Sequence, residues 1–222
     1  MSRNTSFQTK NNTRHVFAVF CFIFVIWAIY RYFPALLPSW SDELILKPIV
    51  WLPPVFFALS KIGQKDLKSL GITTKNLFPS LYWGIGLGLI FAGEGIITNI
   101  FKYRGLNLTI GQTGNSFLLL FGISIVTAIV EEIVFRGFIF HQLAILWKNE
   151  FSASIVSSVL FVIIHLPVGI FALNYTPTAL AVYLSLIFFF AFGSAFVFAR
   201  TKNLASCVLL HLFWSWPIIL FR

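Results

Sequence analysis

The stretch AIVEEIVFRGFIF at residues 128–140 places three ionisable side chains, Glu131, Glu132 and Arg136, inside a run that is otherwise apolar on both sides. A lipid-facing helix would exclude them, because an ionised side chain at mid-bilayer costs about 2.5–3.5 kcal/mol on insertion scales. Such groups instead face a bundle interior or a wet cavity, and they usually serve a function. The stretch therefore predicts a membrane-spanning helix with one polar, inward-facing side.

The composition of the whole chain agrees with this reading. Of 222 residues, 58% are hydrophobic and only 10% are charged, whereas soluble domains are roughly 45–50% apolar and about 25% charged. Each crossing of a bilayer needs about 20 residues, so roughly six to eight spans fit. We expect an all-α, polytopic transmembrane helix bundle of about seven spans with a polar intramembrane cavity, and no second soluble domain.

The apolar runs divide the chain into a polar N-terminal tail at residues 1–15 and a single membrane-embedded domain at residues 16–222. The expected spans are residues 16–33, 44–60, 78–98, 116–147, 152–166, 179–199 and 203–221.

Two of these spans carry unusual residues. Residues 44–60 contain Lys47 and three prolines, which predicts a broken or partly re-entrant helix, and the acidic pair Asp42 and Glu43 precedes them in an expected loop. Residues 78–98 are rich in glycine, and Gly84, Gly86 and Gly88 predict a segment of close helix packing.

The formal net charge of +9 reflects basic residues that fall mostly in the short connections between apolar runs. Membrane orientation and anionic lipid explain this pattern better than nucleic acid does, and no basic cluster with interleaved aromatic residues is present. The distribution of Lys and Arg predicts a cytoplasmic N-terminus. The short chain, the short loops and the absence of organelle signals predict a prokaryotic plasma membrane.

Helical spacing sorts the buried charges into two sets. Glu132 and Arg136 are i and i+4, so they share a face and are expected to pair. Glu131 is turned by roughly 100° from Glu132 and has no basic partner in its own helix. Its surroundings must come from other spans, where His165 and His211 are the available candidates.

An acid and two imidazoles in one cavity suit peptide hydrolysis. A carboxylate and an imidazole can hold one water and take its proton as it attacks a carbonyl. A second imidazole can stabilise the oxyanion that forms. A covalent route finds less support, because G-x-S-x-G is absent and Cys21 and Cys207 lie in apolar runs without the surroundings of a reactive thiolate.

Three other interpretations of the same residues stay open. Two His and one Glu can ligate zinc with an open position, but H-E-x-x-H is absent and the ligands would come from three helices, so no cofactor is expected and zinc is the alternative. A proton-coupled transporter would use the Glu and His groups as a relay, although no inverted repeat is visible. A non-catalytic membrane immunity or sorting factor would bind a hydrophobic tail in the same cavity.

Three short motifs resemble those of a known family. EEIVFR at residues 131–136 matches E-E-x-x-x-R, FVIIH at residues 161–165 matches F-x-x-x-H, and HLFWS at residues 211–215 lies where the family has H-x-x-x-N. This order on three late spans resembles the CAAX-protease and bacteriocin-processing family of intramembrane proteases (CPBP, or Abi). The resemblance covers roughly residues 78–221.

The resemblance implies an intramembrane endopeptidase similar to the type II CAAX prenyl endopeptidases, acting on a membrane-associated or lipidated peptide or protein. By that analogy Glu131 and His165 activate the water, and His211 and Ser215 form the oxyanion site. Supporting positions are the Glu132–Arg136 pair and Phe161, which lies one helical turn before His165 and can wall the same face.

Ser215 departs from the family pattern, which usually has Asn at this position. Serine is shorter and offers one hydroxyl donor, whereas an amide offers two N–H groups at longer reach. Because losing an oxyanion donor can cost about 100- to 1,000-fold in rate, three outcomes stay open. Ser215 substitutes in a more closed geometry, another donor fills in, or the chain is weakly active or inactive.

Overall fold

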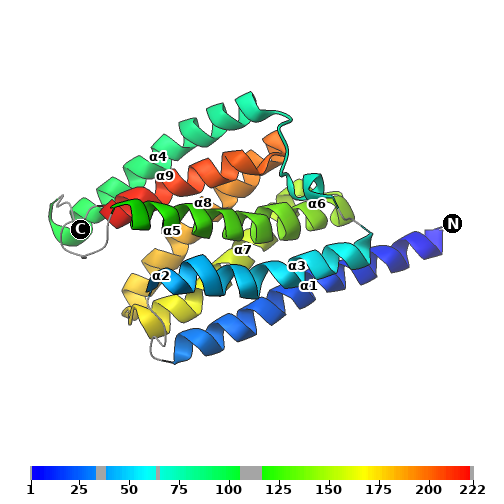
Figure 1. Ribbon diagram of the computed structural model, residues 1–222, viewed down its shortest axis with the longest axis horizontal. Coiled ribbons are helices and arrows are strands. Elements are labelled where there is room, and N and C mark those ends of the chain that lie inside the picture. The colour runs from blue at the N-terminus through cyan, green and yellow to red at the C-terminus, as the bar shows by residue number, and fades with distance from the viewer. Residues whose placement is uncertain (1, 34–38, 64–65, 106–116, 221–222) are drawn as a thin grey trace.

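The computed structural model describes residues 2–33, 39–63, 66–105 and 117–220, and all of the regular structure in these ranges is helical. Figure 1 shows the long helices running back and forth along one direction, with the start of α1 and the end of α9 at opposite ends of the bundle. The helices are α1 (Ser2–Tyr32), α2 (Ser39–Ser41), η1 (Asp42–Leu46), α3 (Lys47–Ile62), η2 (Leu67–Leu70), α4 (Leu77–Tyr103), α5 (Phe117–Glu132), η3 (Ile133–Phe140), α6 (His141–Trp147), α7 (Glu150–Pro167), η4 (Val168–Ala172), α8 (Pro177–Thr201) and α9 (Leu204–Leu220).

The predicted fold class is confirmed. Within the described ranges, 6 helical segments are long and apolar enough to cross a membrane, and Leu204–Pro217 is a shorter apolar helix. The protein is therefore an integral membrane protein with about seven spans. The first helix begins at Ser2, so it extends through the polar N-terminal tail.

The second span is continuous, and the expectation of a broken or re-entrant helix at residues 44–60 was wrong. A single helical segment runs from Asp42 to Ile62, beginning with the π-helical turn η1. Pro48 lies where η1 passes into α3, and Pro53 and Pro54 lie inside α3, so the three prolines do not end the span. The acidic pair Asp42 and Glu43, expected in a loop, belongs to this helix, where it can neutralise buried basic side chains.

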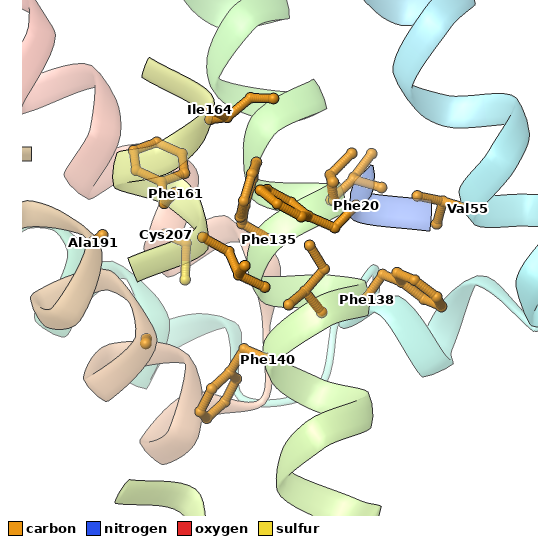
Figure 2. Close-up of a cluster of buried hydrophobic side chains, with 14 of the residues drawn as sticks. Phe20, Val55, Phe135, Phe138, Phe140, Phe161, Ile164, Ala191 and Cys207 are labelled. Atoms are coloured by element: carbon orange, nitrogen blue, oxygen red, sulfur yellow. The ribbon is translucent and has the colours of Figure 1, made fainter. Parts of the chain in front are cut away.

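The helix that carries the opening stretch lies at the centre of the bundle. Helices α5, η3 and α6 follow one another without a break, and all eight residues of the π-helical segment η3 are buried. Figure 2 shows Phe135 of η3 between Phe161 and Phe20. Its ring meets that of Phe161 edge to face, with centroids 4.8 Å apart. This aromatic layer fixes the helices on either side of the cavity described below.

Close packing of α4 against α9 depends on two of the three predicted glycines. A Cβ on Gly84 would lie 2.8 Å from the backbone oxygen of Ser206, and one on Gly88 would lie 2.9 Å from the ring of Phe213. Gly86 has nothing within 4 Å of the equivalent point. Residues four apart share a helix face, so Gly84 and Gly88 face α9 whereas Gly86 points away from it.

We predict that Gly84→Ala destabilises the protein and that Gly86→Ala does not. The first substitution forces α4 away from the Ser206 carbonyl, at a cost of about 1–3 kcal/mol for overpacking. The second removes backbone entropy from the unfolded chain without a clash and gains up to about 1 kcal/mol. Thermal unfolding of both variants in detergent measures the difference, and equal transition temperatures would contradict the packing described for α4.

Candidate active site

A cavity of about 290 Å³ lies inside the bundle, toward the end at which α1, α7 and α9 finish. Its wall combines aromatic and aliphatic side chains with a concentration of ionisable ones. The lining residues are Trp27, Arg31, Glu43, Lys47, Trp51, Ile123, Ser124, Thr127, Glu131, Ile164, His165, Val168, Tyr183, His211 and Ser215. A cavity of this size with polar side chains on its wall admits water.

The structure brings the sequence-predicted residues together. Glu131 from α5, His165 from α7, and His211 and Ser215 from α9 all line this one cavity. Phe161 lies beneath the wall, fully buried, with its ring centroid 4.6 Å from that of His165. Three segments separated by many residues therefore converge on one cavity.

The orientation of His165 is set by its own helix. Its Nδ1 lies 2.7 Å from the carbonyl oxygen of Phe161, one turn earlier. A carbonyl can only accept, so Nδ1 carries the proton, and in the neutral ring Nε2 is left as a proton acceptor. The F-x-x-x-H spacing thus aligns the imidazole as well as supplying a ring beside it.

Glu132 is completely buried and accepts from three directions. Its Oε1 lies 2.8 Å from Nδ1 of His211, and its Oε2 accepts from Ser194 Oγ at 2.9 Å and lies 3.2 Å from Nε of Arg136. The predicted i, i+4 pair is therefore present. Arg136 also donates to the carbonyl oxygen of Ala191 at 3.2 Å. This cluster ties α5 and η3 to α8 and α9.

Glu131 has a partner that sequence reasoning missed. Nζ of Lys47, only 4% exposed, donates to Glu131 Oε1 at 2.8 Å and also contacts Glu43. Helical spacing finds partners within one helix, whereas these residues lie 84 positions apart. One signal was available, because a lysine inside an apolar span requires an anionic partner. The other carboxylate oxygen of Glu131 lies 3.9 Å from His211 Nε2.

The Lys47–Glu131 pair belongs to a larger network of charged side chains from α1, η1 and α3. Arg31 contacts Asp42 at 3.3 Å and Glu43 at 3.1 Å, and Thr127 Oγ1 donates to Glu43 at 2.9 Å. Tyr30 also donates to Asp42. Of the two acidic residues at the start of the second span, Glu43 therefore serves as a counter-ion at the cavity wall, and Asp42 pairs with Arg31.

Ser215 and Glu94, two other polar residues within spans, differ in their relation to the cavity. Ser215 lines the cavity, but its hydroxyl donates to the carbonyl oxygen of Leu212, 3.3 Å away in its own helix. Glu94 accepts from Thr98 at 2.8 Å and does not line this cavity.

Among the described residues, no group of three or more His, Cys, Asp or Glu side chains is arranged to hold a metal ion.

Comparison with known families bears on the segment that carries these motifs. Residues 113–217 match the family model described as Type II CAAX prenyl endopeptidase Rce1-like. The predicted family resemblance is confirmed. The Rce1-like segment includes Glu131, His165, His211 and Ser215, but it leaves out Lys47. No curated protein and no solved structure matches the chain.

We predict that Arg136→Met lowers the free energy of unfolding by about 3–5 kcal/mol, because it leaves the buried Glu132 carboxylate without its cation. Arg200→Met is the matched control, since Arg200 lies at the end of α8 over the ring of Phe196 and away from the cluster. Adding Glu132→Gln to Arg136→Met should recover part of the loss. Denaturation in detergent measures these differences, and equal stability of the two arginine variants would contradict the pairing.

Proposed function

We propose that this protein is an intramembrane endopeptidase that hydrolyses a peptide bond with a water activated by Glu131 and His165. The observation that supports this most is that the carboxylate of Glu131 and the imidazoles of His165 and His211, carried by three different helices, line a single small cavity. The match of residues 113–217 to a family of endopeptidases supports the same reaction class.

On the base side, the water oxygen forms the new bond to the carbonyl carbon, and its proton passes to Glu131. The same proton then goes to the leaving amine nitrogen as the C–N bond breaks, so the carboxylate serves first as base and then as acid. Nε2 of His165 accepts the second hydrogen bond of the water and orients it. Glu131 can play this part because its Oε2, unlike Oε1, is not bonded to Lys47.

On the oxyanion side, His211 is the principal donor. Its Nδ1 is engaged by Glu132 at 2.8 Å, so Nε2 donates to an oxyanion only when both ring nitrogens are protonated. Glu132 supplies the negative charge that stabilises this imidazolium, as a buried carboxylate does in acyl-transfer enzymes. In this proposal Arg136 and Ser194 hold the carboxylate in place, and Ser215, one turn further along α9, becomes a second donor when its hydroxyl turns from the Leu212 carbonyl toward the cavity.

The proposed substrate is a membrane-associated or lipidated peptide or protein, since the cavity lies within a membrane-embedded bundle and the matched family is that of the Rce1-like type II CAAX prenyl endopeptidases. We propose no cofactor. Zinc dependence is the alternative, with Glu131, His165 and His211 as the residues that would have to supply ligands.

The proposed location is a prokaryotic plasma membrane, with the N-terminus in the cytoplasm because basic residues concentrate in the connections on that side. The cavity lies toward the end where α1 finishes, which is opposite to the end where it begins. With this orientation, substrate reaches the cavity from the non-cytoplasmic half of the bilayer.

We predict that purified protein in detergent cleaves members of a library of peptides and lipidated peptides, and that Glu131→Gln reduces the rate by at least about 100-fold, since the base is lost. His165→Ala and His211→Ala should cause losses of the same order. Glu94→Gln is the matched control, because Glu94 is a carboxylate within a span but outside this cavity.

Cleavage that survives Glu131→Gln would reject the mechanism, and a comparable loss in Glu94→Gln would show that the effect is not local. A chelator separates the metal alternative. Inhibition that added zinc reverses would favour a zinc enzyme, whereas an unchanged rate would count against it.

A second function is favoured by one observation. The Ser215 hydroxyl donates its hydrogen bond to the carbonyl oxygen of Leu212 in the same helix and not to a group in the cavity. This arrangement suits a non-catalytic membrane factor that binds a hydrophobic tail in the same space. Absence of cleavage by the wild-type protein across the library, together with retained binding of a lipidated peptide, would support this function over proteolysis.

We predict that Ser215→Asn raises or preserves activity, because the longer amide offers two N–H donors to the oxyanion. Ser185→Asn is the control, since Ser185 bonds to a carbonyl of its own helix but is exposed on α8. Initial rates of peptide cleavage measure both. A collapse of activity in Ser215→Asn alone would show that the serine has a role that an amide cannot fill.

A further inference from the structure

Lys47 stands outside the family-matched segment, yet it touches the proposed catalytic carboxylate. We infer that Lys47 is a positioning residue that fixes Oε1 of Glu131, so that Oε2 is the atom presented to the reacting water. The inference rests on the proposed function and deepens it, because it assigns different roles to the two oxygens of one carboxylate.

The contact is built into the fold. Lys47 is the first residue of α3 and is buried, with Nζ 2.8 Å from Glu131 Oε1. The ammonium also lies over two aromatic faces, 5.5 Å from the ring centroid of Trp27 and 5.3 Å from that of Trp51. These rings leave the cation few directions in which to move, and cation–π attraction holds it there.

A second contact fixes the register between the two helices. Glu43 and Lys47 are one turn apart on the second span, and Thr127 and Glu131 are one turn apart on α5. Thr127 donates to Glu43 at 2.9 Å, and Lys47 donates to Glu131 at 2.8 Å, with the same separation of 84 residues in each pair. The two contacts form successive rungs between the second span and α5, and Arg31 of α1 also contacts Glu43, at 3.1 Å.

The consequence for Glu131 is an asymmetric environment. Oε1 is occupied by a charged donor, whereas Oε2 lies 3.9 Å from Nε2 of His211, beyond hydrogen-bond distance. A reacting oxygen can lie near both of these atoms. If Lys47 did not hold Oε1, the carboxylate could rotate and use either oxygen or turn toward another donor, and a misplacement of about 1 Å in a reacting group can cost about 100-fold in rate.

A purely structural lysine predicts a different outcome from a positioning lysine. Loss of a structural ion pair lowers the amount of folded protein but leaves kcat of the folded fraction unchanged. Loss of a positioning residue lowers kcat and leaves KM unchanged, because substrate binding does not require Oε1 to be fixed. The split between kcat and KM therefore distinguishes the two roles.

The test compares Lys47→Met, Lys47→Arg and Lys47→Ala with wild type, using a peptide that the wild-type protein cleaves. We expect Lys47→Met to lower kcat about 100-fold with KM unchanged, and Lys47→Arg to restore most of the loss by keeping a charged donor. Methylammonium or ethylammonium should restore activity to Lys47→Ala in a saturable manner. Lys61→Met is the control, because Lys61 lies in the last turn of α3 over Phe57 and away from the cavity.

A second variant serves as the control for an effect of Lys47→Met on folding. Lys47→Met leaves Glu43 without its lysine, so Lys47→Met/Glu43→Gln removes the unpaired charge while keeping Glu131 intact, and thermal unfolding confirms that the protein assayed is folded. A wild-type kcat in folded Lys47→Met, or in the double variant, would overturn the inference and leave the proposed function standing. Absence of cleavage by wild type would overturn the proposed function, and the inference with it.

Discussion

Two consecutive carboxylates inside a membrane-spanning helix each need a counter-charge or several hydrogen-bond donors, because an unpaired ion in a dry interior is several kcal/mol less stable than a paired one. Here the partners come from other helices. Glu131 is bonded to Lys47 at the start of α3, and Glu132 is bonded to Ser194 on α8 and His211 on α9. Satisfying these two side chains therefore fixes how three helices, α3, α8 and α9, assemble around α5, and the cavity lies among them.

The rotation of about 100° between neighbours in a helix separates the two carboxylates chemically. Glu132 is 0% exposed, and its oxygens contact Arg136, Ser194 and His211, so it is suited to holding charge and geometry. Glu131 faces the cavity with one oxygen bonded to lysine. A pair of identical residues thus provides one static group and one group with an oxygen open to the cavity.

The sequence predicted what depends on local spacing and missed what depends on register between helices. The Glu132–Arg136 pair follows from i, i+4 geometry, and the convergence of Glu131, His165 and His211 follows from the cost of charges in lipid. The Lys47–Glu131 pair does not follow, because no local pattern relates positions 84 residues apart. For the same reason Lys47 and the prolines were interpreted as breaking a helix, when a cross-helix carboxylate makes the lysine compatible with a continuous span.

Two contacts between the second span and α5, Thr127–Glu43 and Lys47–Glu131, join the family-matched segment to the helices before it. The matched segment carries the acid and both imidazoles, whereas Arg31, Glu43 and Lys47 come from the preceding helices. A slip of one turn, about 5.4 Å, would place Lys47 opposite Thr127 and leave Glu131 buried without a cation. Both rungs would be lost together, so slipped arrangements are strongly disfavoured. The N-terminal helices thereby set the electrostatics of a cavity to which the family-matched segment contributes Glu131, His165 and His211.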